Sequence, residues 1–385
     1  MTLTIWLLSA VSFVVVAVMT VTVPLLPLVA EEFRITVGHA GIIVAAFALP
    51  YGAIQLFMGP LGDKFGKKKV IGGSLLLSTF FVFGSGLSHS IESLATMRFF
   101  SGIAMAGTIP LAMAYIADEV PYSNRQLILG KYISGVISGH IAGGVLGGLA
   151  AEFMDWRHIF FLFSALCFVF SILLLQSRGE GASKKLAQFR EPLHRMYWSM
   201  LADSDKRKII ITGTLEGMFI FGTFSYLGAF LKDSFDISFL SVGLILGMYG
   251  LGGIVYTATV SFLVPALGER KMIFAGSFFL GSCFLILFYI TAVNIMFLLF
   301  FFMGFSFYLF HNTMQMKATQ LSPDAQGVGV SFWAFMLFFG QGIGVFVFGI
   351  LIDKFGYHPS FFFAGFSIIL LGLWFQDSCR VKSDS

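Results

Sequence analysis

The stretch 59-GPLGDKFGKKK-69 gathers charge in a chain that has little of it. Charged residues make up 11% of the 385 residues, yet Asp63 and four lysines fall within seven positions here, among three glycines. The chain as a whole is 57% hydrophobic, contains 48 Phe and has a mean hydropathy of +0.88. A soluble globular protein carries roughly twice this share of charge. We therefore interpret the stretch as a short charged turn between two membrane-spanning helices.

Apolar runs of about 20 residues recur along the whole chain, and each is long enough to cross a ~30 Å hydrocarbon core as a helix. The first run has no basic residue ahead of it and is too long for a signal-peptide core, so we expect it to be retained. The predicted fold class is an all-α integral membrane protein with twelve transmembrane helices, at residues 5–29, 40–61, 70–88, 93–117, 130–151, 158–176, 208–231, 240–264, 272–293, 295–316, 328–351 and 359–376.

The distribution of Lys and Arg predicts the orientation. With a cytosolic N-terminus, 19 of the 24 basic residues fall in cytosolic loops and the tail, four fall on the opposite side, and Arg98 lies inside a span. The positive-inside rule then places both termini in the cytosol. The net charge of +4 faces anionic lipid in this arrangement and does not indicate nucleic-acid binding. The three cysteines lie far apart and have no zinc-binding spacing.

The second half of the chain repeats the first. A long polar stretch, 178–207, separates an N-terminal six-helix bundle (1–177) from a C-terminal six-helix bundle with a short tail (208–385). The sequence LGERK at 267–271 is a degraded copy of FGKKK at 65–69. Two parallel six-helix repeats are typical of secondary transporters that move around a central site. Four pairs share an offset of 201 residues: Gly139 and Gly340, Gly143 and Gly344, Gly148 and Gly349, Glu152 and Asp353.

The polar stretch has a pattern of its own. Apolar side chains recur at helical spacing from Leu186 to Leu201, interrupted by Pro192. This pattern suits a kinked amphipathic helix on the cytosolic leaflet. A plain tether between the two bundles explains it equally well.

The opening stretch resembles the signature loop between helices 2 and 3 of the major facilitator superfamily, and the resemblance covers essentially the whole chain. It implies the major facilitator fold, with a charge network that closes the cytosolic gate. Gly62 would let helix 2 pack on helix 11, and Asp63 would face the N-terminus of helix 11, where the helix dipole favours an anion. A positive-inside loop alone would explain the lysines but not Asp63 with its glycines. The implied latch consists of Gly59, Gly62, Asp63, Gly66, Lys67 and Asp118.

Helix 5 is similar to the antiporter motif of the same family, which is found in exporters more than in importers. The family usually has Pro where Gly144 stands here, so the kink that Pro would give is missing. Glycines cost helix stability, ~1 kcal/mol each relative to Ala, and are tolerated where another helix approaches closely. Ordinary small-residue packing is the alternative. The motif glycines are Gly130, Gly139, Gly143, Gly144, Gly147 and Gly148.

Few polar side chains lie inside the spans. Arg98 resembles the embedded Arg of the family's helix 4, and Glu216 is the one carboxylate that we place well inside a span. His140 in helix 5 is expected to be a packing residue or a proton site. The family implies that helices 1, 4, 7 and 10 line the cavity, and helix 1 lacks the acidic residue that many proton-driven drug exporters carry there. The further cavity candidates are Gln55, Thr223, Tyr226, His311, Asn312, Gln315 and Gln341.

Glu216 is the first candidate for proton coupling. Burial disfavours the ionised form of a carboxyl group, so a change in exposure can load or release a proton. Counted along the helices, Glu216 and His311 lie at similar depth and are expected to interact, whereas Arg98 enters from the other side and would influence substrate charge. The alternative is that Glu216 only packs within its bundle, in which case His311 or His140 becomes the coupling candidate.

The resemblance is strongest to bacterial drug and metabolite efflux antiporters of the inner membrane. We expect a monomer that exports a small amphiphilic or aromatic solute in exchange for protons, without a cofactor or resident metal. A proton-coupled importer or facilitator remains the alternative, and His311, Met314 and Met316 leave copper as a minor one. An intramembrane enzyme is not favoured because no catalytic cluster can be identified. No phosphate-binding loop indicates ATP as the energy source.

Overall fold

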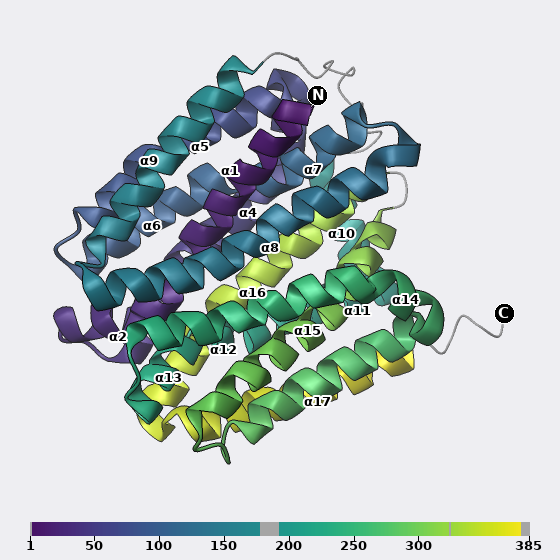
Figure 1. Cartoon of the computed structure of the whole chain (residues 1–385). Coiled ribbons are helices and arrows are strands. Elements are labelled where there is room, and N and C mark those ends of the chain that lie inside the picture. Colours follow the sequence, from purple (N-terminus) through teal and green to yellow (C-terminus); the bar gives the residue numbers. More distant parts are fainter. Residues whose placement is uncertain (1, 178–191, 323–324, 379–385) are drawn as a thin grey trace.

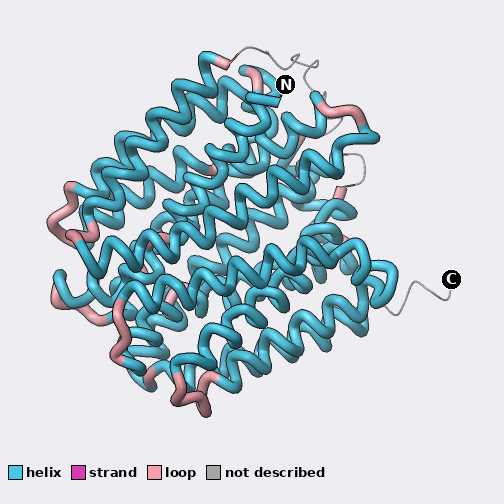
Figure 2. The backbone as a smooth tube through the Cα atoms, viewed as in Figure 1, coloured by secondary structure: helices cyan, strands magenta, loops and turns pink. Residues whose placement is uncertain are grey.

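The computed structural model describes residues 2–177, 192–322 and 325–378, and every regular element in these ranges is helical (Figure 2). Eleven of the described helical segments are long and apolar enough to cross a membrane. One of them, Phe239–Ile286, contains two of the twelve predicted spans, joined at a kink. The prediction of a twelve-span all-helical protein is confirmed, and only the end of the ninth span, Ile286, falls clearly short of its predicted position.

The N-terminal half comprises the first six spans. The first, second and fourth spans are each made of two consecutive helices, which meet near Val21, Gly41 and Gly107. The elements are α1 (Thr2–Thr20), α2 (Thr22–Glu32), α3 (Val37–Ala40), α4 (Ile42–Phe65), α5 (Lys67–Gly86), α6 (Ile91–Met105), α7 (Thr108–Glu119), α8 (Tyr122–Phe153) and α9 (Arg157–Gln176).

The C-terminal half repeats this arrangement after a short helix, α10 (Leu193–Ala202). Its first span is interrupted by one turn of π-helix, η1 (Gly217–Phe221). The remaining elements are α11 (Ser204–Glu216), α12 (Gly222–Phe224), α13 (Leu227–Phe235), α14 (Phe239–Ile286), α15 (Val293–Ala318), a 3₁₀ turn η2 (Thr319–Leu321), α16 (Gln326–Phe355) and α17 (Tyr357–Ser378).

The two halves form two groups of helices that meet along a central seam (Figure 1). Across the seam α4 packs against α16, α8 packs against α14, and α2 packs against α13. Within the halves the main pairs are α1 with α8, α5 with α9, α14 with α15 and α14 with α17. The solved architecture therefore has the two-repeat form that the 201-residue offset predicts.

The sequence Asp-Lys-Phe-Gly occurs twice and ends one helix on each side of the seam. It closes α4 at residues 63–66 and α16 at residues 353–356. Gly66 and Gly356 have φ values of 90° and 83°, which favour glycine, and the next helix starts at the following residue. Gly268, in the LGERK copy, has φ 69°, so it turns the chain as Gly66 does.

α4 and α16 run in opposite directions, so these two endings lie at opposite ends of the bundle. We refer to them as the Lys67 end and the Asp353 end. The short helix α10 lies at the Lys67 end and begins directly after Pro192. The earlier part of the predicted amphipathic segment, from Leu186, lies outside the described residues.

The helix α10 contacts both halves. The Tyr197 ring stacks on Phe332 of α16 at a centroid distance of 4.8 Å, and its hydroxyl donates to the carbonyl of Leu56 in α4 at 3.3 Å. Met200 is buried, whereas Trp198 on the other face is 73% exposed. The linker helix therefore spans the seam with its inner face and presents an aromatic side chain outward.

Candidate functional site

Glu216 and His311 meet inside the C-terminal half. Glu216 ends α11 and its side chain is fully buried, at 0% exposure. Its Oε1 lies 2.6 Å from Nδ1 of His311 on α15, whose side chain is 15% exposed. The expected proximity of these two residues is thus observed. A buried carboxyl group is costly unless it is protonated or paired, and His311 provides the one partner that the structure shows.

The backbone changes its helical form at this point. The π-turn η1 starts at the residue after Glu216, and such π-bulges occur mostly within α-helices and often at functional sites. Aromatic rings enclose the imidazole of His311: Phe307 stacks on it at 4.9 Å, while Trp333 and Phe221 lie at 5.6 Å and 5.9 Å. The π-turn was not predictable from the residues, since no Pro or distinctive motif accompanies it.

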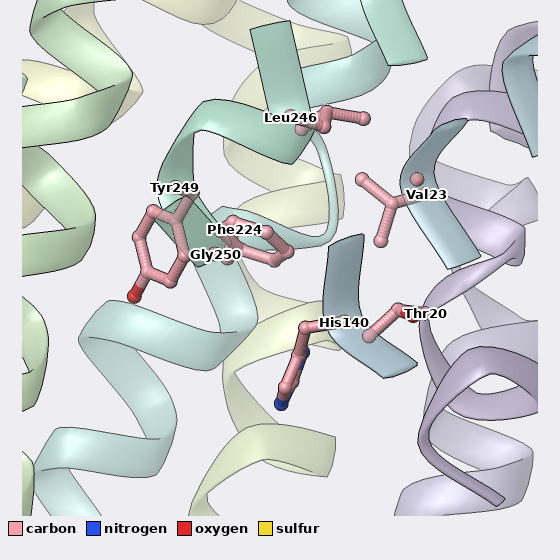
Figure 3. Close-up of a pocket in the computed structure, with 8 residues that line it drawn as sticks. Thr20, Val23, His140, Phe224, Leu246, Tyr249 and Gly250 are labelled. Carbon is pink, nitrogen blue, oxygen red and sulfur yellow. The ribbon is translucent and has the colours of Figure 1, made fainter. Parts of the chain in front are cut away.

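His140 faces this region from the N-terminal half. It lines a cavity of about 10 Å³ together with Thr20, Phe224 and Tyr249, which is room for about one water (Figure 3). Figure 3 shows His140 and Thr20 on one side of the cavity and Tyr249 and Phe224 on the other. His140 lies close enough to His311 for their charges to interact. The cavity therefore lies on the seam, with one histidine from each half near it.

Arg98, the candidate for an influence on substrate charge, does not line this cavity. The side chain is 1% exposed, and its guanidinium donates to the backbone carbonyls of Val18 and Ile43 at 2.8 and 3.3 Å. It also lies over the Phe47 ring at 4.4 Å. Arg98 thus joins α6 to α1 and α4 within the N-terminal half.

The other cavity candidates are distributed over several environments. Tyr226 is buried at the seam, where its hydroxyl donates to Val345 at 2.6 Å. Thr223 is buried and bonded to its own helix, and Asn312 is half-buried near Tyr256. Gln55 and Gln341 are buried, and Gln315 is half-buried. These residues therefore do not form one continuous polar cluster with Glu216.

The three possible copper ligands do not converge on one point. His311 is bound to Glu216, Met314 is fully buried and Met316 is 43% exposed. Among the described residues there is also no group of three or more His, Cys, Asp or Glu that could hold a metal ion. The spacing of His311, Met314 and Met316 in sequence therefore does not translate into a site in space.

Lys67 is the centre of the charged loop. It binds Asp63 at 2.9 Å and Asp118 of α7 at 2.7 Å, as predicted for Asp118. Both partners belong to the N-terminal half, so these ion pairs do not themselves cross the seam. Gly62 differs from the expectation as well: a Cβ there would overlap Leu111 of α7, whereas Gly52, three turns earlier, is the glycine that packs on Phe338 of α16.

The C-terminal half carries the same ion pair with the charges exchanged. Glu269 follows Gly268 as Lys67 follows Gly66, and it pairs with Lys317 near the end of α15. The sequence showed the LGERK copy but not its partner, because Lys317 and Asp118 have opposite charges and no local similarity.

The helix-5 glycines face two different neighbours. A Cβ on Gly139, Gly143 or Gly147 would contact α1 or α2 of the same half. A Cβ on Gly144 or Gly148 would contact Leu246, Gly243 or Phe239 of α14, across the seam. No described residue lies within 4 Å of a Cβ on Gly130 or Gly59 at the Lys67 end. The motif therefore combines one packing stripe within the half with a second, cross-seam stripe.

Two carboxylates bridge the halves at the Asp353 end. Asp353 accepts hydrogen bonds from the Thr36 hydroxyl at 2.6 Å and from the Gly38 N–H at 3.0 Å. Glu152 accepts from the Phe239 N–H at 2.7 Å. The sequence identified both acids only as markers of the repeat. Their partners are two backbone N–H groups and one hydroxyl in the other half, which no sequence motif reveals.

Comparisons with known proteins agree with this architecture. The family model described as Major Facilitator Superfamily matches residues 8–327 and 209–378. The "Uncharacterized MFS-type transporter YceJ" of Bacillus subtilis (strain 168) is 25% identical over 357 residues, which cover 91% of this chain and 89% of that protein.

Two solved structures share the fold at low identity. A bacterial homologue of the human lysosomal transporter Spinster, inward-facing and unoccupied, has a TM-score of 0.80 and 15% identity over 98% of this chain and 96% of its own. A D-xylose-proton symporter has a TM-score of 0.75 and 14% identity over 96% of both chains. At such identity the likeness concerns the fold alone.

Proposed function

The chain belongs to the Major Facilitator Superfamily and is a multi-pass membrane transporter, and we propose that it exports a small amphiphilic or aromatic solute in exchange for protons. The observation that carries this proposal is the fully buried Glu216 bound to His311 beside the seam. Ionisable groups inside membrane spans are rare and mark ion or substrate pathways. Transport, and not chemistry on the solute, is the activity that this architecture supports.

Proton coupling at Glu216 follows from its surroundings. The carboxyl group has no access to solvent in this structure, whereas His311 is partly exposed. A proton would therefore reach Glu216 through His311, whose two ring nitrogens allow it to accept on one side and donate on the other. His140, which faces the same region from the other half, is the second group that can sense this charge.

The two ends of the seam support alternating access. Cross-half hydrogen bonds to Asp353 and Glu152 hold the Asp353 end closed. At the Lys67 end the described ion pairs stay within one half, and Gly59 has open space beside it. We assign the Lys67 end to the cytosol, as the positive-inside rule requires. We therefore propose that this structure represents a cytosol-open state of a transporter in a bacterial inner membrane.

Aromatic and apolar side chains surround both the small seam cavity and His311. A solute pathway that opens between the halves there would favour an amphiphilic or aromatic solute. Phe224 and Tyr249 line the seam cavity, and Phe307 and Phe221 surround His311. Ligand sites of this kind are mostly apolar, with a few polar groups that fix orientation. The polar residues that line the seam cavity are His140, Thr20 and Tyr249.

The test is transport by the purified full-length protein in proteoliposomes with an imposed pH gradient. Solutes are screened in both directions while a trapped dye reports internal pH. Export by antiport predicts that a transported solute moves protons in the opposite direction. Solute movement that leaves the internal pH unchanged would rule out proton coupling.

Glu216→Gln tests the assigned site. It keeps the shape and hydrogen-bonding capacity of the side chain but cannot ionise. We expect accumulation driven by the pH gradient to be lost, while exchange of solute across the membrane at equal pH is retained. The matched control is Glu31→Gln, the same change at an exposed position of α2. If Glu216→Gln accumulates solute at the wild-type rate, the coupling site lies elsewhere.

The assay also distinguishes a second function. The D-xylose-proton symporter has the same fold, so the architecture alone also accommodates proton-driven import. Import is indicated if solute and protons enter together.

A further inference from the structure

Two buried polar atoms beside His311 have no hydrogen-bond partner among the described residues: Oε2 of Glu216 and Nε1 of Trp333. Both side chains are almost completely buried, at 0% and 1% exposure. An ionised carboxylate oxygen accepts hydrogen bonds, and an indole N–H can only donate. Buried donors and acceptors are nearly always paired in folded proteins. The unpaired indole donor and the unpaired carboxylate acceptor therefore suggest that the two atoms form a hydrogen bond with each other in another state of the protein.

The packing of α16 on α11 fixes where the indole points. A Cβ on Gly340 would overlap the carbonyl of Thr214, and one on Gly217 would overlap the carbonyl of Leu337. The two backbones are thus in direct contact along this stretch. Trp333 lies one helical turn before Leu337, and a Cβ on Gly213 would overlap its Nε1. The indole N–H therefore points at α11, into space that Gly213 leaves open.

Glu216 lies on the same side of α11. Residues three apart share one face of a helix, so Glu216 follows Gly213 one turn along, beside the indole. His311 contacts both side chains: its Nδ1 is 2.6 Å from Glu216 Oε1, and its ring centroid is 5.6 Å from that of Trp333. The imidazole thus holds Oε1 of Glu216 and also contacts the Trp333 ring, while Oε2 and the indole N–H both stay unpaired beside it.

We propose that Trp333 is a positioning residue of the coupling site, whose indole N–H stabilises the ionised Glu216 at Oε2 while His311 holds Oε1. The proposal rests on the proton coupling at Glu216 proposed above. A hydrogen bond to the charged form of a group favours that form. A protonated Oε2 carries its own hydrogen and loses this interaction. The indole therefore distinguishes the two charge states of Glu216 and promotes release of the proton.

Other titratable groups near Glu216 are present in both the wild type and the Trp333 variant, so they affect the Glu216 titration equally in both. His311 of α15 and Tyr249 of α14 are the groups whose charge interacts with Glu216. Of the helices packed on α11, α16 carries ionisable side chains only toward its end, at Asp353 and Lys354, and α17 carries them at its ends, at Tyr357, His358 and Asp377. The helix α10 carries His194, Arg195 and Tyr197, α15 carries Tyr308 and Lys317 besides His311, and the turn η2 carries no ionisable side chain.

The experiment is an infrared titration of Glu216 in the full-length protein, in lipid and without solute. The carbonyl band of the protonated carboxyl group is assigned by its loss in Glu216→Gln. The test variant is Trp333→Phe, which keeps an aromatic ring but removes the N–H. The matched control is Trp6→Phe, the same change at a side chain of α1 that is 64% exposed.

We expect the Glu216 band in Trp333→Phe to persist to higher pH than in wild type, by ~1 pH unit, as the loss of one hydrogen bond to a charged group predicts. Trp6→Phe is expected to titrate as wild type. If Trp333→Phe fails to fold, Gly213→Ala displaces the same N–H and is expected to shift the titration in the same direction.

The outcomes separate this inference from the proposed function. A Glu216 band that titrates at the same pH in wild type and Trp333→Phe overturns the role of Trp333 and leaves coupling at Glu216 standing. A wild-type protein in which no Glu216 band appears at any pH overturns both.

Discussion

Glu152 and Asp353 lie 201 residues apart in sequence and make the same contact in space. Glu152 at the end of α8 accepts from the Phe239 N–H in the first turn of α14, and Asp353 at the end of α16 accepts from the Gly38 N–H in α3. Gly38 and Phe239 are themselves 201 residues apart. Each carboxylate of one half therefore caps the first turn of a helix in the other half. Because the two halves repeat each other, the Asp353 end has two equivalent contacts between the halves.

Loss of either carboxylate is expected to open the Asp353 end. Asp353→Asn and Glu152→Gln keep the size of the side chains but remove the charge, which favours both the hydrogen bonds and the helix N-terminus. A hydrogen bond contributes ~1 kcal/mol, which corresponds to about a fivefold change in a two-state population. The measurement is the distance between spin labels on cysteines at Glu31 and Asp236, one in each half at this end.

The double variant should show about the sum of the two shifts, because the contacts are separate. Asp233→Asn is the matched control: it removes a carboxylate at the same end whose partner, the Tyr357 hydroxyl at 2.6 Å, belongs to the same half. A distance distribution that is unchanged in both single variants would contradict the role of these acids in closure.

Asp63→Asn tests the other copy of Asp-Lys-Phe-Gly. In this structure Asp63 binds Lys67, which keeps Asp118 as a second partner. We expect the protein to fold and to populate the state open at the Lys67 end more than wild type, the reverse of Asp353→Asn. Thiol accessibility at this end measures the change. Unchanged accessibility together with unchanged transport would reduce the loop to an orientation signal.

The orientation is tested by labelling from one side of the membrane. Trp198 on α10 and Asp236 after α13 are well exposed, at opposite ends of the bundle. With the three native cysteines replaced by Ser, a cysteine at Trp198 should react from the cytosol and one at Asp236 from outside. The reversed pattern would overturn the orientation and the cytosol-open assignment.

Much of the fold can be predicted from the sequence, because the features that determine it are local to each span or repeat along the chain. Span length, apolar content and the 201-residue offset predict twelve helices in two repeats. The offset even predicts equivalent roles: Gly139 and Gly340 pack within their own halves, and Gly148 and Gly349 pack across the seam. The depth of Glu216 and His311, counted along two helices, likewise predicts their contact.

The contacts that the sequence did not predict depend on which way each side chain points and on which helix face meets which neighbour. A single sequence does not specify either. Arg98 lies within the fourth span as expected, but its guanidinium turns into its own half to bind the carbonyls of Val18 and Ile43. Gly62 lies on the helix expected to meet α16, but on the face that meets Leu111. Rotating a helix about its axis by one residue position changes which neighbour a side chain meets, and a single sequence does not specify that rotation. The sequence therefore did not indicate that Trp333 faces α11 beside Glu216.

The two glycine stripes of α8 give the last prediction, because a Cβ has a different consequence on each. On Gly139 it would overlap the carbonyl of Phe13 within the half, in every state of the transport cycle. On Gly148 it would overlap the carbonyl of Phe239 across the seam, only while the Asp353 end is closed. Gly139→Ala should therefore lower stability, by ~1–3 kcal/mol of overpacking offset by up to ~1 kcal/mol of helix propensity.

Gly148→Ala should instead keep the unfolding temperature near that of wild type and lengthen the distance between labels at Glu31 and Asp236. Thermal unfolding and the spin-label distance, measured on both variants, separate the two effects, and each variant is the control for the other. The physical reason is that separation of the halves relieves the overlap at Gly148, whereas nothing short of unfolding relieves the one at Gly139. If Gly148→Ala lowers the unfolding temperature as Gly139→Ala does and leaves the distance unchanged, the contact between α8 and α14 is a fixed packing surface that does not open.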